Sequence, residues 1–138
     1  MDAFDADVLI YAAVPGHDLG ARVLALFPVE PPGETGTLAG VGSTLLLSEI
    51  LTKPTRDGLA DEIASLAALL GRLDLRPVDE ATALLAVALG SAYGLRSADA
   101  VHLATAVAAG AERFITNNSR NFPRSIEETL ITYPDDLA

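Results

Sequence analysis

The sequence contains no cysteine, only two histidines and a single lysine among its 138 residues. Without cysteine the chain can form neither a disulfide nor a thiolate metal site, and two histidines are too few for the usual zinc cages. A bound metal would therefore have to be held by oxygen atoms. The other eight basic residues are arginines, whose planar side chain is better suited to forked contacts with phosphate.

Long apolar runs and an export signal are also lacking. No stretch approaches ~18 uninterrupted apolar residues. The first residues, Met1 to Asp5, have no basic region that leads into an apolar run and a cleavage site. We therefore expect a soluble, cytoplasmic protein with no membrane segment. The length suits one domain over residues 1–138, large enough to need no covalent staple.

Positive charge is scarce, because nine Lys and Arg residues face 19 Asp and Glu residues. The formal net charge of −10 has the wrong sign for gripping nucleic acid by counterion release alone. Nucleases that use metal ions nevertheless concentrate acids where the cation sits, and a divalent ion reverses the local field that a phosphate meets. The charge thus argues against simple electrostatic binding but leaves metal-dependent phosphate chemistry open.

Hydrophobic periodicity predicts strands that alternate with helices. We expect strands at 2–5, 37–42, 73–78, 113–116 and 129–133, and helices at 17–27, 45–52, 59–73, 80–93 and 97–109, besides one helical turn after the first strand. Pro54 should close the second of these helices, Ser97 should cap the last, and the Pro/Gly-rich segment 28–36 should be a surface loop. This alternation implies a three-layer α/β/α sandwich around a parallel sheet of four to five strands.

Four acidic side chains and a pair of amides fall where such a sheet would place its ligands, beyond the carboxyl ends of the strands. They are Asp5 and Asp7 after the first strand, Glu49 about one turn into a helix, Asp99 in the first turn of an apolar helix, and Asn117-Asn118 after the strand that ends at Thr116.

Each acid also has an ordinary structural explanation. Asp99 would interact favourably with the helix dipole, by about 0.3 to 1 kcal/mol, and this alone accounts for most acids at that position. Asp5 and Asp7 could be turn formers. Glu49 lies among leucines and isoleucine, where a carboxylate should be paired or bind a metal. His102, three residues after Asp99, fits a core or interface histidine better than a ligand.

Taken together, the acids point to a cation. Carboxylates a few ångströms apart raise one another's pKa values unless a cation lies among them. Oxygen ligands without His or Cys select Mg²⁺ or Mn²⁺. We expect the carboxylates of Asp5, Glu49 and Asp99 to lie close enough for one ion to span them.

Three segments of the chain resemble the PIN-domain family, especially the VapC-type toxins of bacterial toxin–antitoxin pairs. Residues 4–11, Phe-Asp-Ala-Asp-Val-Leu-Ile-Tyr, look like the family's D-T-N-V-L-I-Y motif, with Asp5 as the first acid and Asp7 where Asn is usual. Residues 43–50 are similar to the segment with the second acid, which matches Glu49. Residues 95–106 are similar to the third motif, with Asp99 as its acid. The likeness extends over essentially the whole chain.

The resemblance implies an Mg²⁺- or Mn²⁺-dependent endoribonuclease that is the toxin of a toxin–antitoxin pair. It implies that Asp5 and Asp99 hold the metal directly and that Glu49 binds the metal or its water. At the rim, Asp7, Thr116 and Asn118 would contribute to the site, and Arg96, Arg120 and Lys53 would clamp the RNA backbone, with solvated surface charge as an equal alternative for these three. A cognate antitoxin across the groove and a homodimer are also implied.

One departure from the family concerns the end of the strand at Phe114. The segment 114–118, Phe-Ile-Thr-Asn-Asn, looks like the family's F-I-T-N-D, so Asn118 stands where a fourth acid is common. An amide can position water or a ligand, but it brings no charge and cannot serve as a carboxylate base. The loop 28–36 has no counterpart in the motifs, and we expect it to be an insertion.

Two other functions remain open from the sequence. The chain could be a PIN-like domain that has lost nuclease activity and binds RNA or a partner protein, and Asn118 and the net acidity favour this. It could also be an aspartyl-phosphate enzyme or receiver domain. Those chemistries need a lysine late in the chain, whereas the lone lysine is Lys53.

Overall fold

The computed structural model of the chain describes residues 1–29 and 37–138. Most of the loop predicted at 28–36 therefore lies outside the described residues. The elements in chain order are β1 (Asp2–Phe4), α1 (Ala6–Ala12), α2 (Asp18–Leu24), β2 (Gly40–Ser43), α3 (Leu45–Arg56), α4 (Ala60–Leu70), β3 (Leu73–Arg76), α5 (Glu80–Tyr93), α6 (Ser97–Ala108), β4 (Arg113–Ile115), β5 (Leu130–Thr132) and the 3₁₀ turn η1 (Pro134–Asp136).

The five strands form one parallel sheet in the order β3-β2-β1-β4-β5. The chain runs outward from β1 through β2 to β3, and then returns to the other side of β1 to add β4 and β5. The direction of the connections thus reverses between β1 and β4. At such a switch point the loops beyond the carboxyl ends diverge and leave a crevice, so the topology singles out the ends of these two strands.

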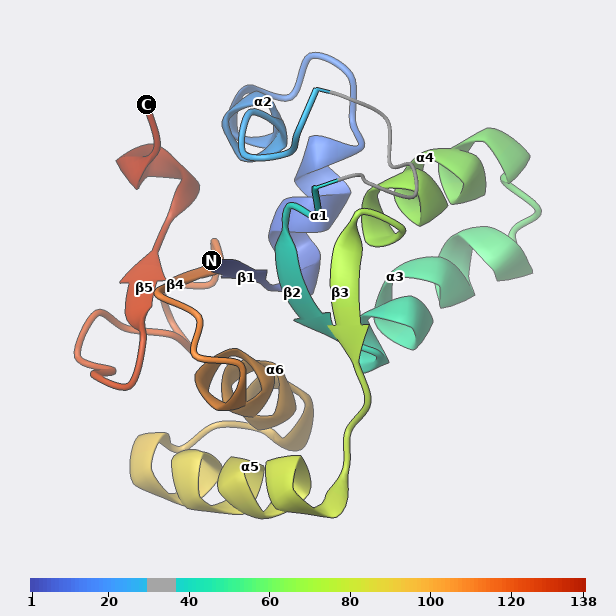
Figure 1. The fold of residues 1–138 in the computed structure, drawn as a ribbon. Coiled ribbons are helices and arrows are strands. Elements are labelled where there is room, and N and C mark those ends of the chain that lie inside the picture. Colours follow the sequence, from blue (N-terminus) through green and yellow to red (C-terminus); the bar gives the residue numbers. More distant parts are fainter. Residues whose placement is uncertain (30–36) are drawn as a thin grey trace.

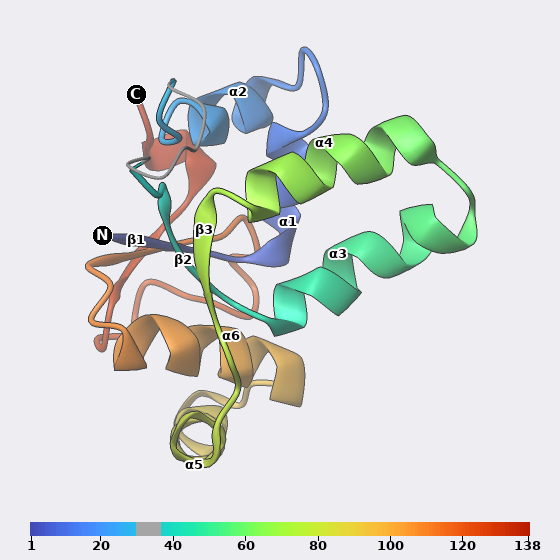
Figure 2. The same ribbon diagram turned by 45° about the vertical axis from the view of Figure 1, so that its right-hand side comes forward.

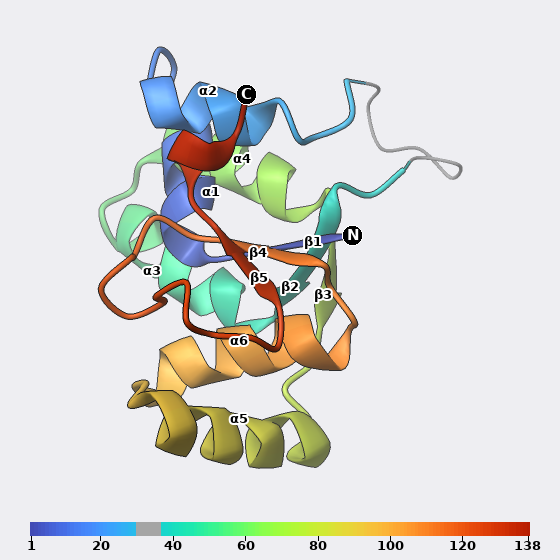
Figure 3. The same cartoon turned by 90° about the vertical axis from the view of Figure 1, so that its left-hand side faces the viewer.

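The sheet lies between two helical layers, with α1 to α4 over one face and α5 and α6 over the other (Figures 1 and 3). Side-chain alternation along the strands builds both cores. Phe4 and Ile115 pack in the cluster under α1 to α4, whereas Ala3 and Phe114 belong to the cluster under α5 and α6. The predicted three-layer α/β/α sandwich is confirmed.

Some local predictions are corrected by the structure. Pro54 does not close its helix, because α3 continues to Arg56 with Pro54 inside it. A proline there forgoes one backbone hydrogen bond, and Pro54 is buried, which offsets part of that loss. The cap of α6 is Arg96 rather than Ser97. The second strand begins at Gly40, where an added Cβ would collide with the carbonyl oxygen of Asp2 in β1.

One helix was predicted to the residue. Helix α5 spans Glu80–Tyr93 and ends at Gly94, whose φ of 66° is the left-handed conformation that glycine adopts readily.

Helices α3 and α4 form an antiparallel pair that reaches away from the sheet (Figure 2). In the described part of the chain, no helix has the length and apolar character needed to cross a membrane.

Candidate active site

Asp5 lies directly after β1, at the switch point, and is 6% exposed. Its backbone N–H donates to the Ile115 carbonyl (2.9 Å), which extends the pairing of β1 with β4. One carboxylate oxygen caps α1 by accepting from the Ala6 N–H (2.8 Å), and the other accepts from the Thr116 hydroxyl (2.8 Å). Strand pairing and helix capping therefore both fix this carboxylate.

Asp7 occupies the first turn of α1, and its side chain turns back toward the end of β4. One oxygen accepts from the Asn117 N–H (3.0 Å) and the other from the neighbouring Val8 N–H (2.7 Å). The structure thus places Asp7 beside Asp5, a position that the sequence could not settle.

Asp99 enters the same region from the first turn of α6. One of its oxygens accepts from the side-chain amide of Asn121 (2.9 Å), a residue of the loop that follows β4. Segments 22 residues apart in the chain are thereby joined. Its charge also acts on both neighbouring acids, since it contributes to the raised pKa values of Asp5 and Asp7.

Glu49 projects from α3 toward α6, where it meets His102. The Oε1 atom of Glu49 lies 3.1 Å from Nε2 of His102, whose side chain is 1% exposed, against 31% for Glu49. The direction of the ring nitrogen does not meet hydrogen-bond geometry, so this is a close contact at ion-pair distance. His102 is thus a core histidine, as its surroundings in the sequence suggested, but one that touches the second acid.

Burial and the charge of neighbouring acids disfavour the charged forms of Asp5 and Asp7. The pKa of Asp5 is raised mainly by burial, with a smaller contribution from Asp99, against the lowering effects of the Thr116 bond, His102 and the Ala6 N–H. The pKa of Asp7 is raised to about 7, first by burial and then by the charge of Asp5. Among the described residues, no Lys or Arg forms an ion pair with either acid or with Asp99.

Whether these residues fit a divalent ion depends on chemistry and on spacing. Hard carboxylate, hydroxyl and amide oxygens are the ligands that Mg²⁺ and Mn²⁺ prefer, and a cation would relieve the repulsion among the acids. The spacing differs from our expectation, because no three acidic or histidine side chains in residues 1–29 and 37–138 lie together as a metal site. That expectation was wrong for the side chains as they lie. The chemistry of the donor set nevertheless fits the ion.

The remaining candidates surround this cluster. Thr116 is fully buried and holds Asp5, as described. Asn118 directs its side-chain oxygen to the Asn121 N–H (3.2 Å), and its own N–H donates to the Thr116 hydroxyl (3.1 Å). Arg96 and Arg120 are exposed, at the start of α6 and in the loop after β4, and neither forms an ion pair in the described part of the chain.

Two contacts were not anticipated from the sequence. Asn121 was not singled out, although it follows Asn118 by three residues, a spacing at which an Asn side chain often accepts from a backbone N–H. The contact between His102 and Glu49 joins residues 53 positions apart. Neither partner could be assigned before α3, α6 and the loop after β4 were placed in space.

Fold and site together define a class: a parallel three-layer α/β protein with an acidic cluster at the sheet's switch point. A family model for the PIN domain matches residues 3–125, and the chain belongs to the PIN-domain family.

Solved structures with the same fold include the toxin–antitoxin complex from Klebsiella pneumoniae. The match has a TM-score of 0.72 at 24% sequence identity and covers 97% of this chain and 98% of that one. Another is VapBC2 from Rickettsia felis bound to a DNA fragment from its promoter, with a TM-score of 0.71 at 17% identity and coverage of 96% and 97%. No curated protein matches the chain.

Proposed function

We propose that this PIN domain is a divalent-metal-dependent endoribonuclease and the toxin component of a toxin–antitoxin pair. The observation that carries the proposal is that the carboxylates of Asp5 and Asp7 lie at the ends of β1 and β4, where burial raises their pKa values and the charge of Asp99 raises them further. Ionisable groups with strongly perturbed pKa values cluster at functional sites. The fold shared with two toxin–antitoxin complexes supports the toxin role.

In this proposal Asp5 and Asp99 hold Mg²⁺ or Mn²⁺, and Glu49 binds the ion or orients its water. A bound divalent ion would lower the pKa of that water and stabilise charge on the scissile phosphate. Thr116 keeps one oxygen of Asp5 in place, and Asn118 shapes the loop at the rim. Arg96, Arg120 and Lys53 are free of ion pairs in the described residues and would contact the RNA backbone.

An antitoxin could bind at a hollow beside Glu49. This hollow of about 310 Å³ lies between α1, α3 and α4, and apolar side chains such as Ile10, Leu59 and Leu66 line it together with the charged Glu49, Lys53 and Glu62. A partner that fills this hollow would also cover Glu49. We further propose that the protein forms a homodimer, which light scattering of the purified chain would test.

The test is cleavage of structured RNA by the purified protein with Mn²⁺ or Mg²⁺, and with EDTA as the metal-free control. We expect cleavage that Asp99→Ala abolishes. Asp18→Ala, which removes an exposed first-turn acid of α2, is the matched control and should leave the rate unchanged. Cleavage that survives in Asp99→Ala would contradict the proposed site.

A binding module remains the second candidate, because Asn118 supplies an amide where a fourth acid is common. The oxygen of this amide is engaged by Asn121, which also fits a loop without a direct catalytic role. Metal binding without cleavage of any RNA tried would favour this candidate.

A further inference from the structure

The carboxylate of Asp99 has one hydrogen-bond partner among the described side chains. This is the amide of Asn121, whose Nδ2 donates to Oδ2 over 2.9 Å. Asp99 is half-buried in the first turn of α6, and no other side chain in the described residues bonds to its carboxylate. The place of its charge in the site therefore depends on where Asn121 is held.

Asn121 belongs to a continuous series of hydrogen bonds that begins at Asp5. The Thr116 hydroxyl donates to Asp5 (2.8 Å) and accepts from the Asn118 N–H (3.1 Å). The Asn118 side-chain oxygen accepts from the Asn121 N–H (3.2 Å), and the Asn121 amide donates to Asp99. The loop 116–121 thus connects the two acids through its own bonds.

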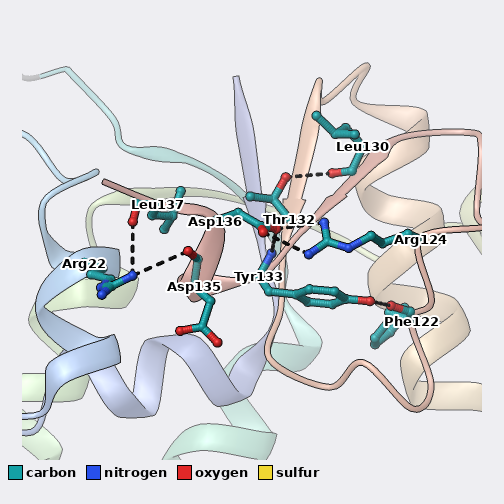
Figure 4. A network of polar contacts seen from close by, with 9 residues as sticks. All are labelled: Arg22, Phe122, Arg124, Leu130, Thr132, Tyr133, Asp135, Asp136 and Leu137. Atoms are coloured by element: carbon teal, nitrogen blue, oxygen red, sulfur yellow. Dashed lines mark hydrogen bonds and ion pairs between the residues drawn. The ribbon is translucent and has the colours of Figure 1, made fainter.

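The far end of this loop is fastened as well. Phe122 is fully buried, with its ring 4.9 Å from that of Phe114, and its carbonyl accepts from the Tyr133 hydroxyl (2.7 Å). Arg124 lies over the Tyr133 ring and donates twice to Asp136 at 2.9 Å (Figure 4). Asn121 is consequently anchored on both sides, which a residue needs if it is to position another.

We propose that Asn121 is a positioning residue that sets the Asp99 carboxylate relative to Asp5, so that both acids can bind one divalent ion. The proposal rests on the proposed nuclease function. Asn121 acts through Asp99 and does not itself contact the ion or the RNA. Partners that orient a metal ligand in this way typically contribute ~10 to 100-fold to metal affinity or activity.

The experiment is calorimetric titration of the full-length, metal-free protein with Mn²⁺. Asn121→Leu keeps the shape of the side chain but cannot donate, and we expect it to weaken Mn²⁺ binding by roughly tenfold. Ser119→Ala is the control in the same loop, because Ser119 is exposed and its side chain forms no hydrogen bond in the described residues. It should bind Mn²⁺ as wild type does. If Asn121→Leu folds poorly, Asn121→Ala replaces it.

A double-mutant cycle separates positioning from a general structural effect. In an Asp99→Asn background, Asn121→Leu should weaken Mn²⁺ binding no further, because the carboxylate through which Asn121 acts on the metal is already absent. An equal loss in both backgrounds would overturn the proposal. With RNA, the kcat of Asn121→Leu should fall at low Mn²⁺ and recover at high Mn²⁺, with KM unchanged.

The outcomes distinguish this inference from the function on which it rests. Wild-type protein that cleaves RNA, with an Asn121→Leu variant that binds Mn²⁺ equally well, would overturn the role of Asn121 and leave the nuclease function standing. Mn²⁺ binding that weakens in Asn121→Leu, with no RNA cleaved by wild type, would support the positioning role and refute the nuclease. Absence of Mn²⁺ binding by wild type would overturn both.

Discussion

Aspartates at the two ends of the β1–β4 strand pair have different hydrogen-bond partners, charged at one end and neutral at the other. At the amino ends, Asp2 lies opposite Arg113 and accepts two hydrogen bonds from its guanidinium (2.8 and 2.9 Å). At the carboxyl ends, Asp5 meets the Thr116 hydroxyl, and Asp7 meets a backbone N–H. One end has a complete ion pair, whereas the other has buried acids with neutral donors.

The pKa shifts record the same contrast. The bond to Asp2 raises the pKa of Arg113, and Arg124 holds the pKa of Asp136 below its usual range. Burial instead raises the pKa values of Asp5 and Asp7. Asp2, Asp57, Asp74 and Asp136 each pair with an arginine, whereas the acids of this cluster have no arginine partner among the described residues, at a cost in stability. Such a local exception is typical of a functional site.

The largest effect is expected from a substitution at the carboxyl ends of the strands. Asp5→Asn should lower kcat/KM for RNA roughly 10³-fold or more, because an amide cannot replace a carboxylate at a divalent ion. Asp2→Asn, three residues earlier, should leave the rate close to that of wild type. Initial rates in Mn²⁺ measure both. Similar losses in the two variants would show that overall stability, and not the site, controls activity.

The next effect is on stability without divalent ions. The folded-state pKa of Asp7, about 7, lies above the ordinary 3.8, so the fold favours the protonated form. Stability from this group is fully present below pH 3.8 and is lost as pH rises through 7. We expect the free energy of unfolding in EDTA to fall by a few kcal/mol between these limits.

Urea denaturation at several pH values measures this slope. Asp7→Asn should flatten it, and Mg²⁺ should recover part of the stability of wild type near pH 8, because a cation favours the ionised acids. A free energy of unfolding that rises over the same interval would contradict the assignment.

A smaller effect is expected at the amino ends of the strands. Arg113→Gln removes the partner of Asp2, whose side chain is 17% exposed. We expect a loss of roughly 1 kcal/mol, because the pair is partly screened by solvent. Urea denaturation should show this loss with RNA cleavage retained. A loss of cleavage at unchanged stability would instead show that the Asp2–Arg113 pair affects the site at the other end of the strands.

The smallest effect is expected for the exposed pair of Arg124 and Asp136. Arg124→Gln should lower the melting temperature slightly at neutral pH. Because the pKa of Asp136 is lowered in the fold, this contribution exists above the ordinary pKa of Asp and is lost as pH falls through the lowered value. The melting temperatures of variant and wild type should therefore converge in acid. A difference that persists there would point to the contact with the Tyr133 ring instead.

Much of the architecture could be predicted from local patterns. Helix α5 was predicted to the residue because its apolar periodicity starts at Glu80 and Gly94 marks its end; the cap by Asp79 was not anticipated. The end of α3 was not, since the rule that proline stops a helix neglects the burial of Pro54. Asp5 and the residues after Thr116 were predicted at the same edge of the sheet because parallel strands carry their carboxyl ends to one edge; that the two strands are neighbours came from the structure.

The partners of the acids could not be read in this way. Asn121 reaches Asp99, and His102 reaches Glu49, across segments whose separation depends on how α3 and α6 pack against opposite faces of the sheet. The convergence of three carboxylates on one point, expected from the motifs, was wrong in detail for the same reason. Motif residues give the chemistry available, whereas the angstrom-scale placement comes from packing.

The sequence by itself determined the element order, the parallel sheet and the oxygen-only chemistry, because periodicity, turn residues and composition act over short stretches of chain. The tertiary structure alone decided that Asp2 forms an ion pair with Arg113. It also decided that hydrogen bonds of the loop 116–121 connect Asp5 with Asp99. Strand register and loop anchoring bring these groups together, and both are products of contacts between residues distant in the chain.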